Sequence, residues 1–417
     1  MESGFRAFGG LLHQLPRAGL DGQTVRPGLF PRFGSYPLLG GVEVRPRRKG
    51  YPGKRLIWLL ACAVLAGAIN VLTAVGGLRT IKVWDRALLR PAEAVAAVSP
   101  RVAAARPKRP PAEGGLPPGM VLGYFYDPGN AGNAVAMLQH YLPFLTGIIP
   151  FWYTVQANGT ISGQTNPAVL QVAQQHHLWT FALVENMAGQ SVFGPLLNSP
   201  VARRRTIDNL LTLVEANGYS GINLDWEGIA PSERHAFSTF VENLSAVFHQ
   251  HGYYVTLSLP AETQNQPANS WTGAYNYAKL GRYADLIMVM AYDQHWAGGS
   301  PGPIAAPSWV KQVLNYAISV VSPQKVILGI PGYGYDWSGQ GATALSYNQA
   351  QALARQYSST SGQNHFVYTQ NGETHSVWFE NTESLLNKIQ LVGGYELRGI
   401  ALWRLGIEDP KMWSFLQ

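Results

Sequence analysis

The sequence predicts an α/β fold, a closed (β/α)8 barrel, for residues 119–417. Apolar runs of strand length alternate there with helical patterns, which indicates a parallel sheet that is covered on both faces. Eight such runs are present, whereas an open doubly wound sheet usually has fewer. No Gly-x-Gly-x-x-Gly or phosphate-loop pattern favours a nucleotide-binding fold. The predicted strands are Val121–Tyr126, Gly147–Tyr153, Trp179–Val184, Gly221–Glu227, Tyr254–Leu259, Leu286–Tyr292, Val326–Ile330 and Ile400–Trp403.

Charge divides the chain into two parts. Residues 1–118 contain 18 Lys and Arg against 6 Asp and Glu, whereas residues 119–417 contain 13 against 18. The formal net charge of +7 therefore comes from the segment before the barrel and does not indicate a polyanionic ligand. We expect no nucleic-acid partner, and the sequence does not indicate an oligomeric state.

The segment before the barrel predicts attachment to a membrane. Residues 1–55 are rich in Gly, Pro and Arg without periodicity, so we expect a disordered, basic cytoplasmic tail. The uncharged run at 56–78 is long enough to cross a bilayer as one transmembrane helix. Its stronger basic flank lies on the N-terminal side, which favours an N-terminus inside the cell. A cleaved signal peptide is the alternative. Residues 79–118 form a linker rich in Pro and Ala, so we expect the barrel at the outer face of the cell membrane.

Helical patterns lie between most of the predicted strands, most clearly at Val201–Ala216, Ser232–Gln250 and Ser308–Val321. One segment between the seventh and eighth strands breaks the alternation. Two strand-like runs, 366–369 and 375–379, flank Asn371-Gly372, a dipeptide typical of a two-residue hairpin turn. We expect a small insertion beside the barrel mouth, which either walls a groove or has no role in binding.

The fourth predicted strand carries three polar residues at alternate positions, Asn223, Asp225 and Glu227. Residues two apart in a strand share a face, so the apolar residues between them point the other way. Two carboxylates on so apolar a strand either form the solvated face of an edge strand or lie in a cleft for proton transfer. The apolar opposite face favours the cleft.

Catalytic residues of such barrels lie at the C-terminal ends of the strands. A carboxylate pair ringed by aromatic side chains is typical of a site for a sugar ring, although packing is the better explanation for any one of these aromatic residues taken alone. Glu185, which follows the third strand, is either a subsite residue or a salt-bridge partner. The histidines show no ligand spacing, so we expect neither a metal nor another cofactor. The other candidates at the strand ends are Tyr124, Trp152, Tyr292, Asp293 and Trp403.

These residues resemble glycoside hydrolase family 18. The run Ser220-Gly-Ile-Asn-Leu-Asp-Trp-Glu227 is similar to the family signature Asp-Gly-x-Asp-x-Asp-x-Glu, and Met290-Ala-Tyr-Asp293 is similar to its Met-x-Tyr-Asp motif. Leu328–Gly334 and Ile400–Trp403 resemble its seventh and eighth strands. Asn223 and the run Trp403-Arg-Leu-Gly406 resemble the bacterial spore-germination and cortex-lytic branch more than the chitinases.

The resemblance implies substrate-assisted retaining catalysis. Glu227 would protonate the leaving oxygen, and Asp225 would orient the N-acetyl group whose oxygen attacks the anomeric carbon. Tyr292 would hydrogen-bond that group. The predicted substrate-binding residues are Trp403, Asn223, Met290, Asp293, Tyr124 and Trp152.

Two positions depart from the family pattern. Ser220 stands where the first Asp is usual; it begins the strand and is expected to affect stability more than turnover. Asn223 stands where chitinases have the middle Asp. An amide cannot share a proton with a carboxylate, so Asn223 would keep Asp225 charged.

The function implied is hydrolysis of β-1,4 bonds at N-acetylglucosamine in peptidoglycan, in spore cortex or cell wall. The partners expected are this polysaccharide and the membrane. The alternatives are a chitinase or chitooligosaccharide hydrolase, and an inactive glycan-binding barrel. Retention of Glu227 argues against the inactive barrel.

Overall fold

The computed structural model describes residues 116–127, 133–186, 189–339, 341–357 and 364–416. The predicted basic tail (1–55), the predicted transmembrane helix (56–78) and most of the linker (79–118) lie outside these residues. Within the described ranges, no helix is both long enough and apolar enough to cross a membrane.

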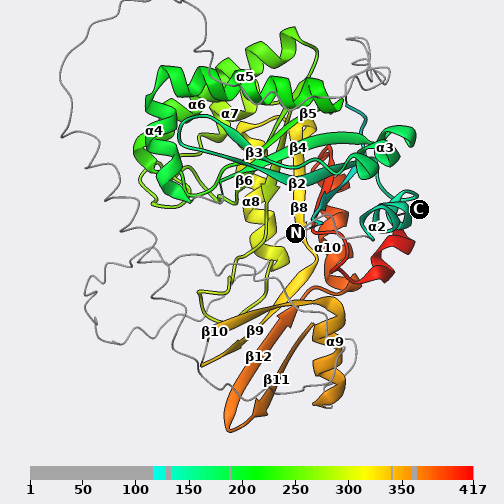
Figure 1. Ribbon diagram of the computed structural model, residues 1–417. Coiled ribbons are helices and arrows are strands. Elements are labelled where there is room, and N and C mark those ends of the chain that lie inside the picture. The colour runs from blue at the N-terminus through cyan, green and yellow to red at the C-terminus, as the bar shows by residue number, and fades with distance from the viewer. Residues whose placement is uncertain (1–115, 128–132, 187–188, 340, 358–363, 417) are drawn as a thin grey trace, which may run out of the picture. The chain divides into compact units, whose positions relative to one another are not determined.

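The described residues contain a closed barrel of eight parallel strands, which confirms the predicted fold (Figure 1). All eight predicted strands are present. Each strand pairs with the next in chain order, and the last pairs with the first to complete the circle. A short strand, β3 (Ile161–Gly163), adds to the second strand in antiparallel direction. The barrel strands are β1 (Met120–Phe125), β2 (Gly147–Val155), β4 (Trp179–Glu185), β5 (Gly221–Asp225), β6 (Tyr254–Pro260), β7 (Leu286–Met290), β8 (Val326–Pro331) and β13 (Gly399–Trp403).

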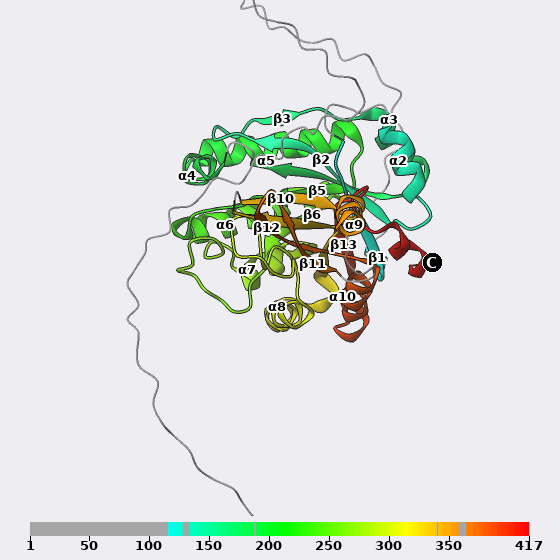
Figure 2. The same ribbon diagram turned by 90° about the horizontal axis from the view of Figure 1, so that it is seen from below.

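Helices surround the strands (Figure 2). The three predicted helices correspond to α5 (Pro200–Asn217), α6 (Arg234–Gln250) and α8 (Pro307–Val320). The apolar residues of α6 recur at helical spacing, and Phe237, Phe240 and Leu244 are all buried against the barrel. The helices are α2 (Ala134–Tyr141), α3 (Pro167–Gln175), α4 (Phe193–Asn198), α5 (Pro200–Asn217), α6 (Arg234–Gln250), α7 (Tyr277–Tyr283), α8 (Pro307–Val320) and α10 (Thr382–Gly394), with 3-10 turns η1 (Gln190–Val192), η2 (Pro231–Glu233), η3 (Pro323–Lys325) and η4 (Pro410–Phe415).

The side chains of β5 and of the residue after it point alternately into two different layers of the barrel. Ile222, Leu224 and Trp226 lie in the core between strands and helices, where the Trp226 ring stacks on Phe240 at 5.0 Å between centroids. Alternate residues point inward instead, as strand geometry requires. The barrel interior holds a smaller cluster that includes Tyr124, Ile149 and Met288.

The insertion between β8 and β13 is larger than the sequence predicts. The hairpin is confirmed: the strands pair from His365 to Trp378, and Asn371 and Gly372 have φ values of 53° and 81°, as a type I′ turn requires. Two further strands and a helix belong to the same unit, which lies at the end of the barrel where β8 ends (Figures 1 and 2). Its elements are β9 (Tyr333–Ser338), β10 (Gly341–Ser346), α9 (Tyr347–Gln356), β11 (His365–Gln370) and β12 (Glu373–Phe379), with sheet order β10-β9-β12-β11.

Candidate active site

The acidic residues of β5 lie at the carboxyl end of the barrel. Asp225 is the last residue of β5, pairs in register with Glu185 of β4, and is 6% exposed. Glu227 follows two residues later, in the loop after the strand, and is partly exposed. Because Trp226 anchors the outer core, the acids on either side of it turn toward the mouth of the barrel.

A chain of hydrogen bonds supports β5 from inside the barrel. The Thr256 hydroxyl donates to the Ile222 carbonyl at 2.9 Å and accepts from the Asn223 amide nitrogen at 3.0 Å. The Ser258 hydroxyl donates to the amide oxygen of Asn223 at 2.9 Å and lies 2.7 Å from the Tyr124 hydroxyl. Asn223 is therefore fully buried beneath Asp225, with its amide directed to β6. Tyr124 is 1% exposed and lies in the same layer rather than in an open cleft.

The pKa values of the two acids are raised to different extents. Burial raises the pKa of Asp225 to about 7, and the negative charge of Glu185 adds to the effect. It raises the pKa of Glu227 well above the ordinary range, with smaller contributions from Asp225 and Asp293. The larger upward shift is that of Glu227, which favours Glu227 as the proton donor of the pair. Asp225 Oδ1 is buried and has no hydrogen-bond partner among the described residues, so its capacity to accept a hydrogen bond is unused.

Two residues that the sequence did not indicate hold the backbone of Trp226 and Glu227. Asn186 follows β4 directly; its amide donates to the Glu227 carbonyl and accepts from the Glu227 N–H, both at 2.9 Å. The Tyr275 hydroxyl donates to the Trp226 carbonyl at 2.8 Å. The Asn186 side chain thus extends the pairing of β4 with β5 beyond the last strand residue. An Asn next to the end of the neighbouring strand is the only signal that the sequence offered.

Aromatic side chains surround the acids. The Trp403 ring lies 5.2 Å from Tyr124 and 5.7 Å from Phe151, between centroids, at the end of β13. Burial raises the pKa of Tyr292 well above its usual range, and nearby Tyr124, Asp225 and Glu227 raise it further. Phe151 is a third residue that the sequence did not indicate.

Asp293 joins the mouth of the barrel to the insertion. It accepts hydrogen bonds from the hydroxyls of Tyr333 at 2.5 Å and Tyr335 at 3.1 Å, both in β9. Met290 ends β7, two residues beyond Met288, which lies in the barrel interior; residues two apart in a strand share a face. Asp225, Glu227, Tyr292, Asp293 and Trp403 are therefore brought to one end of the barrel, as predicted from the strand ends.

A model of glycosyl hydrolases family 18 matches residues 121–408. The chain belongs to this family.

Relatives within family 18 include bacterial spore proteins and chitinases. The putative sporulation-specific glycosylase YdhD of Bacillus subtilis is 32% identical over 307 residues, which are 69% of this chain and 73% of that protein. The spore cortex-lytic enzyme SleL of Bacillus cereus superposes with a TM-score of 0.67 at 28% identity, covering 73% of this chain and 74% of SleL. A chitinase from Chromobacterium violaceum superposes with a TM-score of 0.66 at 29% identity, covering 72% of this chain and 98% of the chitinase.

Ser220, which departs from the family 18 signature, precedes β5 at the opposite end of the strand from the acids. Its hydroxyl accepts from the Thr180 N–H at 3.0 Å, and its own N–H donates to the Thr180 carbonyl at 2.8 Å. The residue thus ties the start of β5 to β4 and does not contact the acids.

Trp152 is not brought to the acids, in contrast to the prediction for it. The pairing of β2 with β4 shifts between Phe151 and Tyr153, so the side-chain alternation is displaced at this point. Phe151 takes the inward position, whereas Trp152 packs with Phe125 in the outer core and donates its indole N–H to Asp127. A bulge of this kind leaves no mark in an apolar strand sequence.

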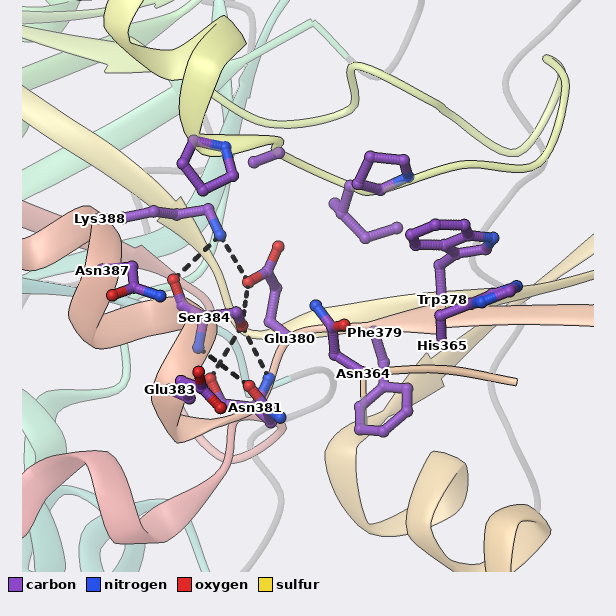
Figure 3. A pocket seen from close by; sticks show the side chains of 14 residues that line it. Asn364, His365, Trp378, Phe379, Glu380, Asn381, Glu383, Ser384, Asn387 and Lys388 are labelled. Atoms are coloured by element: carbon purple, nitrogen blue, oxygen red, sulfur yellow. Dashed lines mark hydrogen bonds and ion pairs between the residues drawn. The ribbon is translucent and has the colours of Figure 1, made fainter. Parts of the chain in front are cut away.

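A separate hollow of about 580 Å³ lies between the segment before α8, the insertion and the start of α10 (Figure 3). Lys388 and Glu380 point toward one another there and form an ion pair at 2.7 Å, with side chains 1% and 3% exposed. None of the predicted catalytic residues lines this hollow. Its buried charges are paired with each other, which indicates a role in attaching α10 to the insertion.

Proposed function

We propose that this family 18 glycosidase hydrolyses β-1,4 bonds at N-acetylglucosamine in peptidoglycan, by substrate-assisted retaining catalysis, at the outer face of the cell membrane. One observation carries the chemistry: Glu227, whose pKa burial raises well above its ordinary range, lies two residues from the buried carboxyl group of Asp225, whose Oδ1 has no hydrogen-bond partner among the described residues.

In the first step Glu227 gives its proton to the glycosidic oxygen, and the bond from that oxygen to the anomeric carbon breaks. The acetamide carbonyl oxygen of the same sugar attacks the anomeric carbon and forms an oxazolinium ring. Asp225 accepts the acetamide N–H and balances the positive charge of the ring. Tyr292 donates a hydrogen bond to the acetamide, and Trp403 supports the face of the sugar.

In the second step a water attacks the anomeric carbon, and Glu227, now a carboxylate, takes its proton. The acetamide is released, and the configuration at the anomeric carbon is retained because it has been displaced twice. Asn186 and Tyr275 hold the backbone on either side of the general acid through both steps.

Peptidoglycan is favoured as substrate by the relatives whose names carry the words spore cortex-lytic or sporulation-specific. Chitin is the second candidate, because a chitinase superposes over 98% of its length at similar identity. The uncharged run at 56–78 with its basic flank supports attachment to the membrane.

The test is the substitution Glu227→Gln in the full chain, with Glu383→Gln as control, since Glu383 is an exposed carboxylate on α10. We expect Glu227→Gln to abolish the release of reducing ends from purified peptidoglycan and Glu383→Gln to retain it. Full activity of Glu227→Gln would refute the mechanism. Faster cleavage of soluble chitin than of peptidoglycan by the wild type would favour the chitinase, and binding without any hydrolysis would favour an inactive barrel.

A further inference from the structure

Arg404 lies at the rim of the candidate site, directly after Trp403. Its guanidinium carbon is 4.6 Å from the centroid of the Tyr126 ring. The Tyr126 ring is 5.7 Å from Phe151, and Phe151 is 5.7 Å from Trp403. Arg404 is thus part of the aromatic border that runs from Trp403 around the mouth of the barrel.

The positive charge of Arg404 is not neutralised within the described part of the chain, where it forms no ion pair or hydrogen bond. Glu408 is the carboxylate that acts on it, but this group is already saturated. One Glu408 oxygen accepts from Tyr141 and Trp413, and the other accepts from the N–H groups of Gly406 and Ile407. All four contacts are 3.1 Å or shorter.

A partly buried guanidinium without an anion is costly, because burial removes water from the charge without replacing its hydrogen bonds. Contact with the Tyr126 face offsets only part of this cost. The edge of the guanidinium carries N–H donors in a planar fork that matches a carboxylate, and a ring against its flat face leaves this edge able to bind one.

We propose that Arg404 binds a carboxylate of the substrate and so selects peptidoglycan over chitin. This inference rests on the proposed function. Chitin is uniformly neutral, whereas the second sugar of peptidoglycan carries a lactyl ether that ends in a carboxyl group. That group is either free or continues into a stem peptide with carboxylates of its own. The free lactyl carboxylate and the stem-peptide carboxylates are both anions that could pair with the guanidinium of Arg404.

The test compares Arg404→Gln with wild type on four forms of one glycan. Two of the forms are glycan chains that carry their stem peptides and glycan chains from which the stem peptides have been removed. The other two are the same two preparations after all carboxyl groups have been converted to methylamides. We expect wild type to prefer the charged form, and Arg404→Gln to lower the ratio of kcat/KM for charged over amidated glycan roughly 10- to 100-fold, the range for a lost charge-assisted contact. Arg404→Lys, which keeps the charge without the fork, should give an intermediate ratio.

Arg204→Gln is the control for charge, because Arg204 is exposed on α5 and pairs with Asp208. Melting temperatures show whether each variant is folded. If the ratio falls only for the stripped glycan chains, the group that binds Arg404 is the lactyl carboxylate. If it falls only for the peptide-bearing chains, that group is a carboxylate of the stem peptide. Either result supports the proposal. An equal loss of kcat/KM on charged and amidated glycan would overturn it and leave Arg404 a packing residue. If wild type cleaves none of the four forms, the proposed function itself fails.

Discussion

Removal of the Asn186 side chain tests whether the catalytic acid must be held by its backbone. Asn186→Ala deletes two hydrogen bonds of 2.9 Å to Glu227. At about 0.5–1.5 kcal/mol each, their loss costs about 1–3 kcal/mol of folding stability. The larger effect is expected in the rate. Glu227 lies beyond the last paired residue of β5, and a displacement of about 1 Å costs roughly 100-fold in kcat.

The assay is kcat and KM for reducing-end release from peptidoglycan, with melting temperature measured on the same samples. Asn186→Asp separates position from charge: a carboxylate still accepts the Glu227 N–H, but it cannot donate to the carbonyl, and it adds negative charge near the acid. Asn198→Ala is the matched control, because Asn198 is exposed and its amide also donates to a backbone carbonyl, at 3.0 Å. A kcat for Asn186→Ala within threefold of wild type would refute the positioning argument, since a merely structural contact affects the melting temperature alone.

Three further predictions concern charge. Glu185→Gln removes a negative charge that helps to raise the pKa of Asp225, so we expect this pKa to fall. The acid limb of the plot of kcat/KM against pH should then move to lower pH. An acid limb that does not move would contradict the role of Asp225 as the ionised group of the pair. Lys388→Met leaves Glu380 buried without its partner and should cost about 3–5 kcal/mol in denaturant unfolding, and Lys388→Met with Glu380→Gln should recover part of that loss. Glu227→Gln should raise the melting temperature by an amount that grows with pH. The folded state holds the Glu227 proton above its ordinary pKa, so wild type loses stability as pH rises from that value toward the folded pKa; a pH-independent difference would show that the pKa of Glu227 is not raised.

Features that depend on neighbours along the chain follow from the amino-acid sequence alone. Alternation placed Asn223 and Asp225 on the inner face of β5 and Trp226 in the outer core. Asn371-Gly372 predicted the hairpin because both residues accept positive φ. The order of strands predicted which residues gather at the mouth, because parallel strands that alternate with helices close with their carboxyl ends together.

Features that depend on contacts between distant segments follow only from the folded chain. The side chain of Asn186 meets the backbone of Glu227 from 41 residues away, and the sequence has no local pattern for this contact. The shift in pairing at Phe151 turns Trp152 to the outer core, since register depends on both strands of a pair. The unpaired charge of Arg404 follows from the saturation of Glu408 by four donors, two of which come from α2 and η4. Local sequence patterns specify which face of a strand a residue occupies. The assembled barrel determines which neighbours bond to its polar groups and neutralise its charge.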